Sequence, residues 1–120
     1  MTHDDFARWL NAYVDAWRTY DPAAIGSLFS EDARYRYNPW GDPLVGRAAI
    51  VKDWVENPDE PGTWTAEYRP WIVDGTDAVA TGVSRYDDKD GKREYHNVFL
   101  CRFDADGRCR EFTEVYLKRS

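Results

Sequence analysis

The chain has 120 residues, of which 42% are hydrophobic and 16% aromatic, and its formal net charge is −6. This length and apolar content are enough for one domain, residues 1–120, with a buried core, and they exclude a disordered chain. The acidic balance argues against nucleic acid and anionic membrane surfaces as partners, because both are bound through basic patches. No apolar run approaches the ~20 residues of a membrane span and the N-terminus has no secretory pattern, so we expect a cytoplasmic protein.

The first half of the chain has the apolar spacing of amphipathic helices. A spacing of i, i+3, i+4, i+7, i+8 and i+11 predicts a first helix over about residues 4–20, on Phe6, Trp9, Leu10, Tyr13, Val14 and Trp17. A second, short helix begins at Asp21-Pro22, where Asp caps the helix and Pro occupies its first turn, and ends at residues 30–32. A third helix is predicted over about residues 48–57, before Pro58.

Strands make up the rest of the chain. A first strand over residues 33–38 lies between the second and third helices and stops at Asn38-Pro39, because proline cannot donate to a sheet. Four more are predicted in order, over residues 63–73, 78–86, 93–103 and 108–117. Glycine-containing turns separate them, which predicts antiparallel hairpins.

Helices segregated from an antiparallel sheet define the α+β class. We expect a cone-shaped α+β barrel, in which three helices from the N-terminal half pack on a curved, mostly antiparallel sheet. The cone should enclose one pocket, with its mouth at the loop of residues 38–46.

The chain has only two histidines and two cysteines. Cys101 and Cys109 flank a predicted turn, and we expect both to be reduced and buried, since two cysteines do not form a disulfide framework. His3 lies near the terminus, which leaves His96 as the one usable histidine. We therefore expect no metal site and no cofactor.

The order of elements resembles the SnoaL-like members of the nuclear-transport-factor-two-like superfamily. The residues that carry the resemblance are Tyr13 in the first helix, residues 28–33, residues 39–50, and residues 103–108 followed by Glu114 and Tyr116. The resemblance covers nearly the whole chain and implies a conical α+β fold with a pocket. That fold hosts isomerases, cyclases, lyases, epoxide hydrolases and plain binding modules, so it does not define one function.

Ketosteroid isomerases of this superfamily share one of three functional positions with the chain. Their helix tyrosine matches Tyr13, their carboxylate base falls on Tyr37 or Asn38, and their protonated aspartate falls on Phe99. Neither Tyr nor Asn is a base for carbon acids near neutral pH, given a tyrosine pKa near ~10. We therefore expect a chemistry other than steroid isomerisation.

The limonene-epoxide-hydrolase type resembles other parts of the chain. Its Arg-x-Asp pair is similar to residues 85–87, and its second aspartate falls on Glu114. Its tyrosine-x-asparagine pair falls on residues 35–37 or on residues 36–38. The resemblance implies acid/base roles for Arg85, Asp87 and Glu114.

The alternation of side chains along a strand places Phe112, Glu114 and Tyr116 on one face of the last strand. If that face points inward, desolvation raises the Glu114 pKa towards the range needed for general acid/base work at neutral pH. The alternative is an ion pair at a wet surface. His96 lies mid-strand and has the same two alternatives, a proton relay in the pocket or a surface residue.

We therefore expect a pocket for an apolar, cyclic small molecule, with cofactor-free acid/base chemistry of the isomerase, cyclase, lyase or epoxide-hydrolase type. The candidate catalytic residues are Glu114, Asp87, Arg85 and His96. The candidate substrate-binding residues are Tyr13, Trp17, Tyr35, Tyr37, Asn38, Trp40, Trp54, Trp71, Phe99, Phe112 and Tyr116. The alternative is a non-catalytic ligand-binding or dimeric interaction module. In either case we expect a homodimer through the outer face of the sheet.

Overall fold

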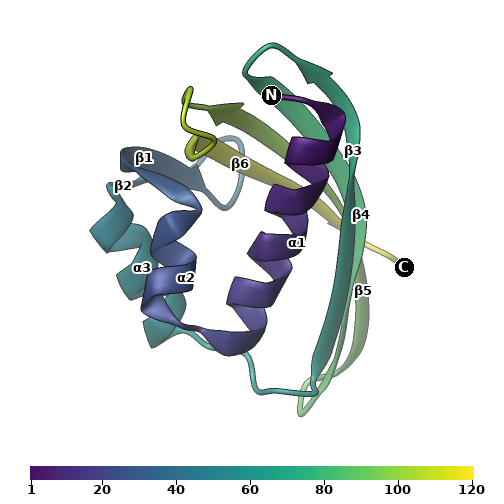
Figure 1. The fold of residues 1–120 in the computed structure, drawn as a ribbon. Helices are drawn as coiled ribbons and strands as arrows, with labels where there is room; N and C mark the ends of the chain where they lie inside the picture. Colours follow the sequence, from purple (N-terminus) through teal and green to yellow (C-terminus); the bar gives the residue numbers. More distant parts are fainter.

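Three helices pack against one curved sheet in this computed structural model, which describes residues 1–120. The helices are α1 (His3–Thr19), α2 (Pro22–Ser27) and α3 (Arg47–Glu56). The strands are β1 (Phe29–Arg36), β2 (Leu44–Val45), β3 (Trp64–Asp74), β4 (Asp77–Asp88), β5 (Gly91–Phe103) and β6 (Cys109–Lys118). Figure 1 shows α1 lying in the hollow of the sheet, with α2 and α3 beside β1 and β2. The predicted α+β cone is confirmed, with a sheet that does not close into a barrel.

The six strands follow the order β2-β1-β6-β5-β4-β3. The strands β3 to β6 form the predicted antiparallel meander, and β1 returns beside β6 in parallel, with Tyr35 opposite Phe112. In β3 one extra residue, Trp71, lies between the pairs that Pro70 and Ile72 make with β4. Such a bulge bends a strand and increases its twist, so it contributes to the curvature of the sheet around α1.

The second helix ends earlier, and the first strand begins earlier, than the sequence predicts. Residues 30–32 belong to β1, and α2 stops at Ser27. Phe29 is fully buried and pairs with Cys109 of β6, and the Cys109 N–H donates to the Leu28 carbonyl at 2.9 Å. This long-range pairing decides the boundary because it outweighs local propensity. The two-residue strand β2 was not predicted.

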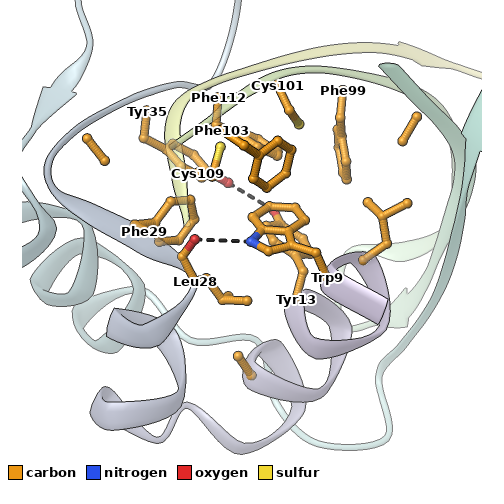
Figure 2. Packing of buried hydrophobic residues seen from close by; sticks show 14 of the residues in the cluster. Trp9, Tyr13, Leu28, Phe29, Tyr35, Phe99, Cys101, Phe103, Cys109 and Phe112 are labelled. Atoms are coloured by element: carbon orange, nitrogen blue, oxygen red, sulfur yellow. Dashed lines mark hydrogen bonds between the residues drawn. The ribbon is translucent and has the colours of Figure 1, made fainter. Parts of the chain in front are cut away.

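The closed end of the cone is an aromatic core around the first half of α1. Trp9 packs edge-on against Phe103, with ring centroids 5.3 Å apart, and its indole N–H donates to the Leu28 carbonyl at 3.0 Å (Figure 2). Cys101 and Cys109 lie in this core as free, buried thiols, which confirms that part of the prediction. Burial raises the pKa of the Cys101 thiol well above its ordinary value.

No helix of the structure is both long enough and apolar enough to cross a membrane.

Candidate functional site

A cavity of about 160 Å³ lies at the other end of the cone, beside the second half of α1. Eight of its twelve lining residues are Tyr or Trp, and the others are three carboxylates and one amide. The lining residues are Tyr13, Trp17, Tyr20, Tyr35, Tyr37, Asp53, Trp54, Asn57, Asp59, Tyr68, Tyr86 and Glu114. The one continuous helix α1 therefore contributes to both ends of the cone, with Trp9 in the core and Trp17 in the pocket.

Glu114 reaches the pocket from the inner face of β6. Its neighbour on the same face, Phe112, is fully buried in the core, so the alternation along β6 directs Glu114 inward. Asn97 of β5 donates its amide N–H to Glu114 Oε1 at 3.0 Å, and the Ser84 hydroxyl of β4 donates to Asn97 Oδ1 at 3.0 Å. Asn97 and Ser84 are both buried. Three adjacent strands thus position one carboxylate through a continuous hydrogen-bonded chain.

Burial raises the pKa of Glu114 to about 7, and the hydrogen bond from Asn97 partly opposes this rise. Glu114 forms no ion pair with Lys, Arg or His in the structure, since its one side-chain partner is an uncharged amide. A carboxyl group with a pKa near neutrality can both accept and return a proton at physiological pH.

Two buried tyrosines face each other beside this carboxylate. The hydroxyl oxygens of Tyr13 in α1 and Tyr35 in β1 are 2.9 Å apart, and Figure 2 shows the two side chains pointing toward one another. Burial is the first cause that raises the pKa of both phenols, so both hydroxyls are neutral at physiological pH. Only one of the two hydroxyl protons is needed for the bond between them. The other is available to donate to an oxygen of a ligand.

The mouth of the pocket is held by hydrogen bonds to two aspartates. The Tyr37 hydroxyl donates to Asp53 of α3, and the Trp17 indole N–H donates to Asp59 Oδ2 at 3.0 Å. The Asp59 backbone N–H in turn donates to the Tyr20 hydroxyl at 2.8 Å. These bonds connect α1, the residue that follows β1, α3 and the loop after α3 around one opening.

Gly82 of β4 makes room for a tyrosine in the pocket wall. A Cβ atom at this position would collide with the Glu67 carbonyl oxygen and with the Tyr68 ring. Tyr68 lies against Phe99, with ring centroids 4.4 Å apart. The absence of a side chain at residue 82 therefore lets the Tyr68 ring lie flat over β4 and line the cavity.

The structure brings six of the predicted site residues together in the pocket. They are Glu114, Tyr13, Trp17, Tyr35, Tyr37 and Trp54. Their roles in catalysis or binding stay predictions, whereas their convergence on one cavity is a property of the structure.

Three candidate catalytic residues lie on the opposite face of the sheet, which corrects the expectation that they share a cavity with Glu114. Ser84 and Asn97 are buried on the inner face, so their neighbours Arg85 and His96 point outward. Arg85 Nε lies 2.9 Å from Glu94 Oε1 and His96 Nε2 lies 3.0 Å from Glu94 Oε2. Asp87 is exposed on the same outer side.

The remaining candidate binding residues lie outside the cavity lining. Trp40 is 85% exposed in the loop after β1, and Trp71 is 73% exposed at the β3 bulge. The others are Asn38 in the loop after β1, Tyr116 near the end of β6, and Phe99 and Phe112, which are core residues behind the pocket wall. The expected mouth at residues 38–46 is also corrected, since none of these residues lines the cavity.

Sequence reasoning missed the two tyrosines of β3 and β4 and the two aspartates at the mouth. Tyr68 and Tyr86 lie in strands with an alternating pattern. Only the register between the strands shows that both side chains face the cavity, and the sequence does not give that register. Asp53 is a polar residue beside the buried face of α3 that Ile50 and Trp54 form, and Asp59 lies in an acidic loop, where no periodicity fixes the direction of a side chain. No group of three or more His, Cys, Asp or Glu side chains converges in the structure in a way that could hold a metal ion.

The architecture of the chain is shared with solved structures at low sequence identity. An LEH-like epoxide hydrolase from M. tuberculosis has a TM-score of 0.72 at 14% identity, with 96% of this chain and 84% of that chain covered. An NTF-2 like protein of unknown function from Burkholderia xenovorans LB400 has a TM-score of 0.71 at 18% identity. The alignment covers 94% of this chain and 83% of that chain. A ketosteroid-isomerase-like protein from Kribbella flavida DSM 17836 has a TM-score of 0.72 at 18% identity. The alignment covers 98% of this chain and 82% of that chain.

At these identities the structural likeness shows the fold alone, and the family rests on sequence. No curated protein matches the chain in sequence. The SnoaL-like domain matches residues 10–112, which include the second half of α1 with Tyr13, strand β1 with Tyr35, and most of the sheet. The chain therefore belongs to the SnoaL-like domain family.

Proposed function

We propose that the protein binds a small, cyclic, largely apolar molecule in this pocket and that Glu114 transfers a proton to or from it without a cofactor. The observation that carries the proposal is a carboxylate in an aromatic cavity whose one side-chain partner is an amide. Positioned proton transfer of this kind contributes roughly 10²–10⁴-fold to a rate.

The tyrosine pair supplies the second part of the proposed chemistry. Removal of a proton from carbon moves negative charge onto an oxygen of the substrate. A neutral hydroxyl of Tyr13 or Tyr35 can donate a hydrogen bond to that oxygen, because the pair is buried and held in place. Glu114 as base and a phenol as donor together support an isomerase, cyclase or lyase.

Epoxide hydrolysis is less well supported by the same geometry. The limonene-epoxide-hydrolase type requires an Arg-x-Asp pair beside the second carboxylate. In this chain the matching Arg85 and Asp87 lie on the outer face of the sheet, away from Glu114. We therefore favour proton transfer at carbon over activation of water.

The test uses 5-nitrobenzisoxazole, an aromatic probe whose ring opens when a base removes a proton from carbon. The carbon loses its proton to the base, the N–O bond breaks, and a nitrile and a phenolate form. The wild-type protein should accelerate this reaction, and Glu114→Gln should lower kcat/KM by about 100-fold or more. Glu94→Gln, on the outer face, is the matched control and should stay within about twofold of wild type. Equal rates for wild type and Glu114→Gln would refute the proposal.

The alternative function is a non-catalytic binding module. It is favoured by the single deep carboxylate, since Glu114 has no second acid or base within its hydrogen-bonded chain. Quenching of tryptophan fluorescence by the probe, without any Glu114-dependent rate, would identify that alternative.

We also propose that the outer face of the sheet pairs with a second copy of the chain. An apolar stripe crosses this face, in which Val79 of β4 lies between Ile72 of β3 and Leu100 of β5. Ion pairs of Glu94 and of Arg102 lie on either side of the stripe. Apolar side chains that are flanked by charges are typical of an interface core and its rim.

Light scattering at micromolar concentration should give twice the 14.0 kDa mass of one chain. Leu100→Glu should reduce this to the mass of one chain, whereas Val55→Glu, at an equally exposed apolar position on α3, should leave it unchanged. A wild-type protein with the mass of one chain would contradict the proposed dimer.

A further inference from the structure

We propose that the ligand of this pocket is an organic cation, an ammonium group attached to an apolar ring. The inference names the ligand class and rests on the proposed function only in taking the pocket as the binding site. It depends on the charges and aromatic faces that line the cavity.

The pocket wall carries three carboxylates and no basic side chain. Asp53, Asp59 and Glu114 all line the cavity, whereas none of the 16 Lys and Arg residues and neither His does so. The concentration of acidic groups at one cavity contrasts with the outer face, where arginines and carboxylates alternate in ion pairs.

The hydrogen-bond donors to these carboxylates are all neutral. Asp53 accepts from the Tyr37 hydroxyl, Asp59 accepts from the Trp17 indole N–H, and Glu114 accepts from the Asn97 amide. None of the three forms an ion pair. Each donor satisfies one oxygen without cancelling the negative charge, so the cavity has a negative potential that favours a cation and opposes an anion.

The rest of the wall has the surface that cations prefer. Six tyrosines and two tryptophans line the cavity, and the electron-rich faces of such rings attract ammonium groups. At the mouth, Trp17 lies near Tyr86, with ring centroids 6.2 Å apart, and Trp17 is bonded to Asp59. A negative group beside aromatic faces is the arrangement that recognises an ammonium group in water.

The two kinds of carboxylate in the pocket lie at different depths. Asp53 and Asp59 hold the mouth, whereas Glu114 lies on the sheet and is bonded to the buried Asn97. We therefore place the ammonium group between the mouth aspartates. The apolar ring then extends inward along Trp54 and Tyr68 toward Glu114, where proton transfer is proposed.

Three small probes with the same ring test the charge preference. They are 2-phenylethylamine as the cation, 2-phenylethanol as the neutral analogue and 3-phenylpropionate as the anion. Titration calorimetry and fluorescence of the pocket tryptophans should show the amine binding about tenfold more tightly than the alcohol, and no binding of the anion. Added salt should weaken binding of the amine and leave the alcohol unchanged.

Variants at the mouth of the pocket show which carboxylates cause the preference for the amine. Asp53→Asn and Asp59→Asn should each weaken amine binding several-fold and leave alcohol binding intact, which also shows that the pocket is still folded. Asp74→Asn removes the same charge six residues beyond Tyr68 on β3, roughly 20 Å along the strand, and should change neither affinity.

The inference is overturned if the amine and the alcohol bind equally, if the anion binds more tightly than the amine, or if the amine fails to bind at millimolar concentration. These outcomes are separate from those of the proton-transfer test. A tenfold amine preference without Glu114-dependent ring opening refutes the proposed function and supports the ligand class. Glu114-dependent ring opening without an amine preference refutes the ligand class alone.

Discussion

Two glutamates on neighbouring strands of the same sheet have opposite properties. Glu114 on the inner face of β6 is desolvated among aromatic rings, and its pKa is raised to about 7. Glu94 on the outer face of β5 accepts hydrogen bonds from His96, Arg119 and Arg85, and these lower its pKa to about 2. The sheet therefore separates a carboxyl group that can exchange protons near neutral pH from one that stays ionised.

The face of the sheet on which a glutamate lies, and not the residue type, therefore decides the pKa of its carboxyl group. Inward positions of β4, β5 and β6 carry Ser84, Asn97 and Glu114 in one chain of hydrogen bonds without charged partners. Outward positions of the same strands carry charged side chains that neutralise one another in contact with water. Four substitutions test this contrast between the two faces of the sheet.

The largest effect is expected from Glu114→Gln on stability at alkaline pH. The ordinary pKa of 4.5 applies to the unfolded chain, and the folded pKa is about 7. Between these values the folded state keeps a proton that the unfolded state loses, so the free energy of unfolding falls as pH rises from 4.5 to 7. Above pH 7 the buried charge costs about 3 kcal/mol. Glu114→Gln should therefore be more stable than wild type by up to about 3 kcal/mol at pH 8.

Urea unfolding at pH 4 and at pH 8 checks this prediction. At pH 4 both chains are neutral at residue 114, and the variant should match wild type within about 0.5 kcal/mol. A variant that is less stable than wild type at both pH values would show that Glu114 is not desolvated.

A smaller effect is expected from Gly82→Ala, which tests how closely the inner face is packed. The added Cβ meets the Glu67 carbonyl and the Tyr68 ring, so the strand or the ring must shift at a cost of about 2 kcal/mol. Thr81→Ala, the adjacent outward position, should cost less than about 1 kcal/mol. Thermal unfolding of both variants measures the difference, and equal losses would contradict the asymmetry between the faces.

The next effect concerns the single donor to Glu114. Asn97→Leu removes the hydrogen bond that favours the charged carboxylate, so the Glu114 pKa should rise further, by about one unit. The pH dependence of 5-nitrobenzisoxazole ring opening reports this pKa as its inflection. His96→Leu, one residue earlier on the outer face, should leave the inflection in place. An unchanged inflection in Asn97→Leu would show that the Asn97 amide does not control the carboxylate.

Much of the fold could be predicted because its signals are local. The spacing from Phe6 to Trp17 gives α1 to within about a residue at each end, and the turns at Gly75, Gly91 and Gly107 all have a positive φ, which favours glycine. The start of β1 could not be predicted in this way. Phe29 is a strand residue because it pairs with Cys109, which is distant in sequence and invisible to any local pattern.

The sequence predicts only part of the candidate site, because local patterns do not show how a strand is oriented in the fold. Alternation shows which residues of a strand share a face, but it does not show which face is inside. In β6 the sequence leaves this question open for Glu114, and the structure answers it because Phe112 on the same face is fully buried. In β4 both faces carry apolar residues, with Ala80 inward and Val79 outward, so Arg85 and Asp87 were assigned to the wrong side. Only the register against β3 and β5 fixes that side.

The smallest effect is expected from Glu94→Gln, and its pH dependence has the opposite sign. A folded pKa below the ordinary value means that Glu94 stabilises the fold above pH 4.5 and that this contribution is lost as pH falls from 4.5 toward 2. The variant should be slightly less stable than wild type at pH 7 and should equal it in strong acid. Because its ion pairs are solvent-exposed, the difference should shrink in high salt. Urea unfolding at low and high salt measures this. A Glu94→Gln variant that gains stability at alkaline pH, as predicted for Glu114→Gln, would contradict the opposite environments of the two faces.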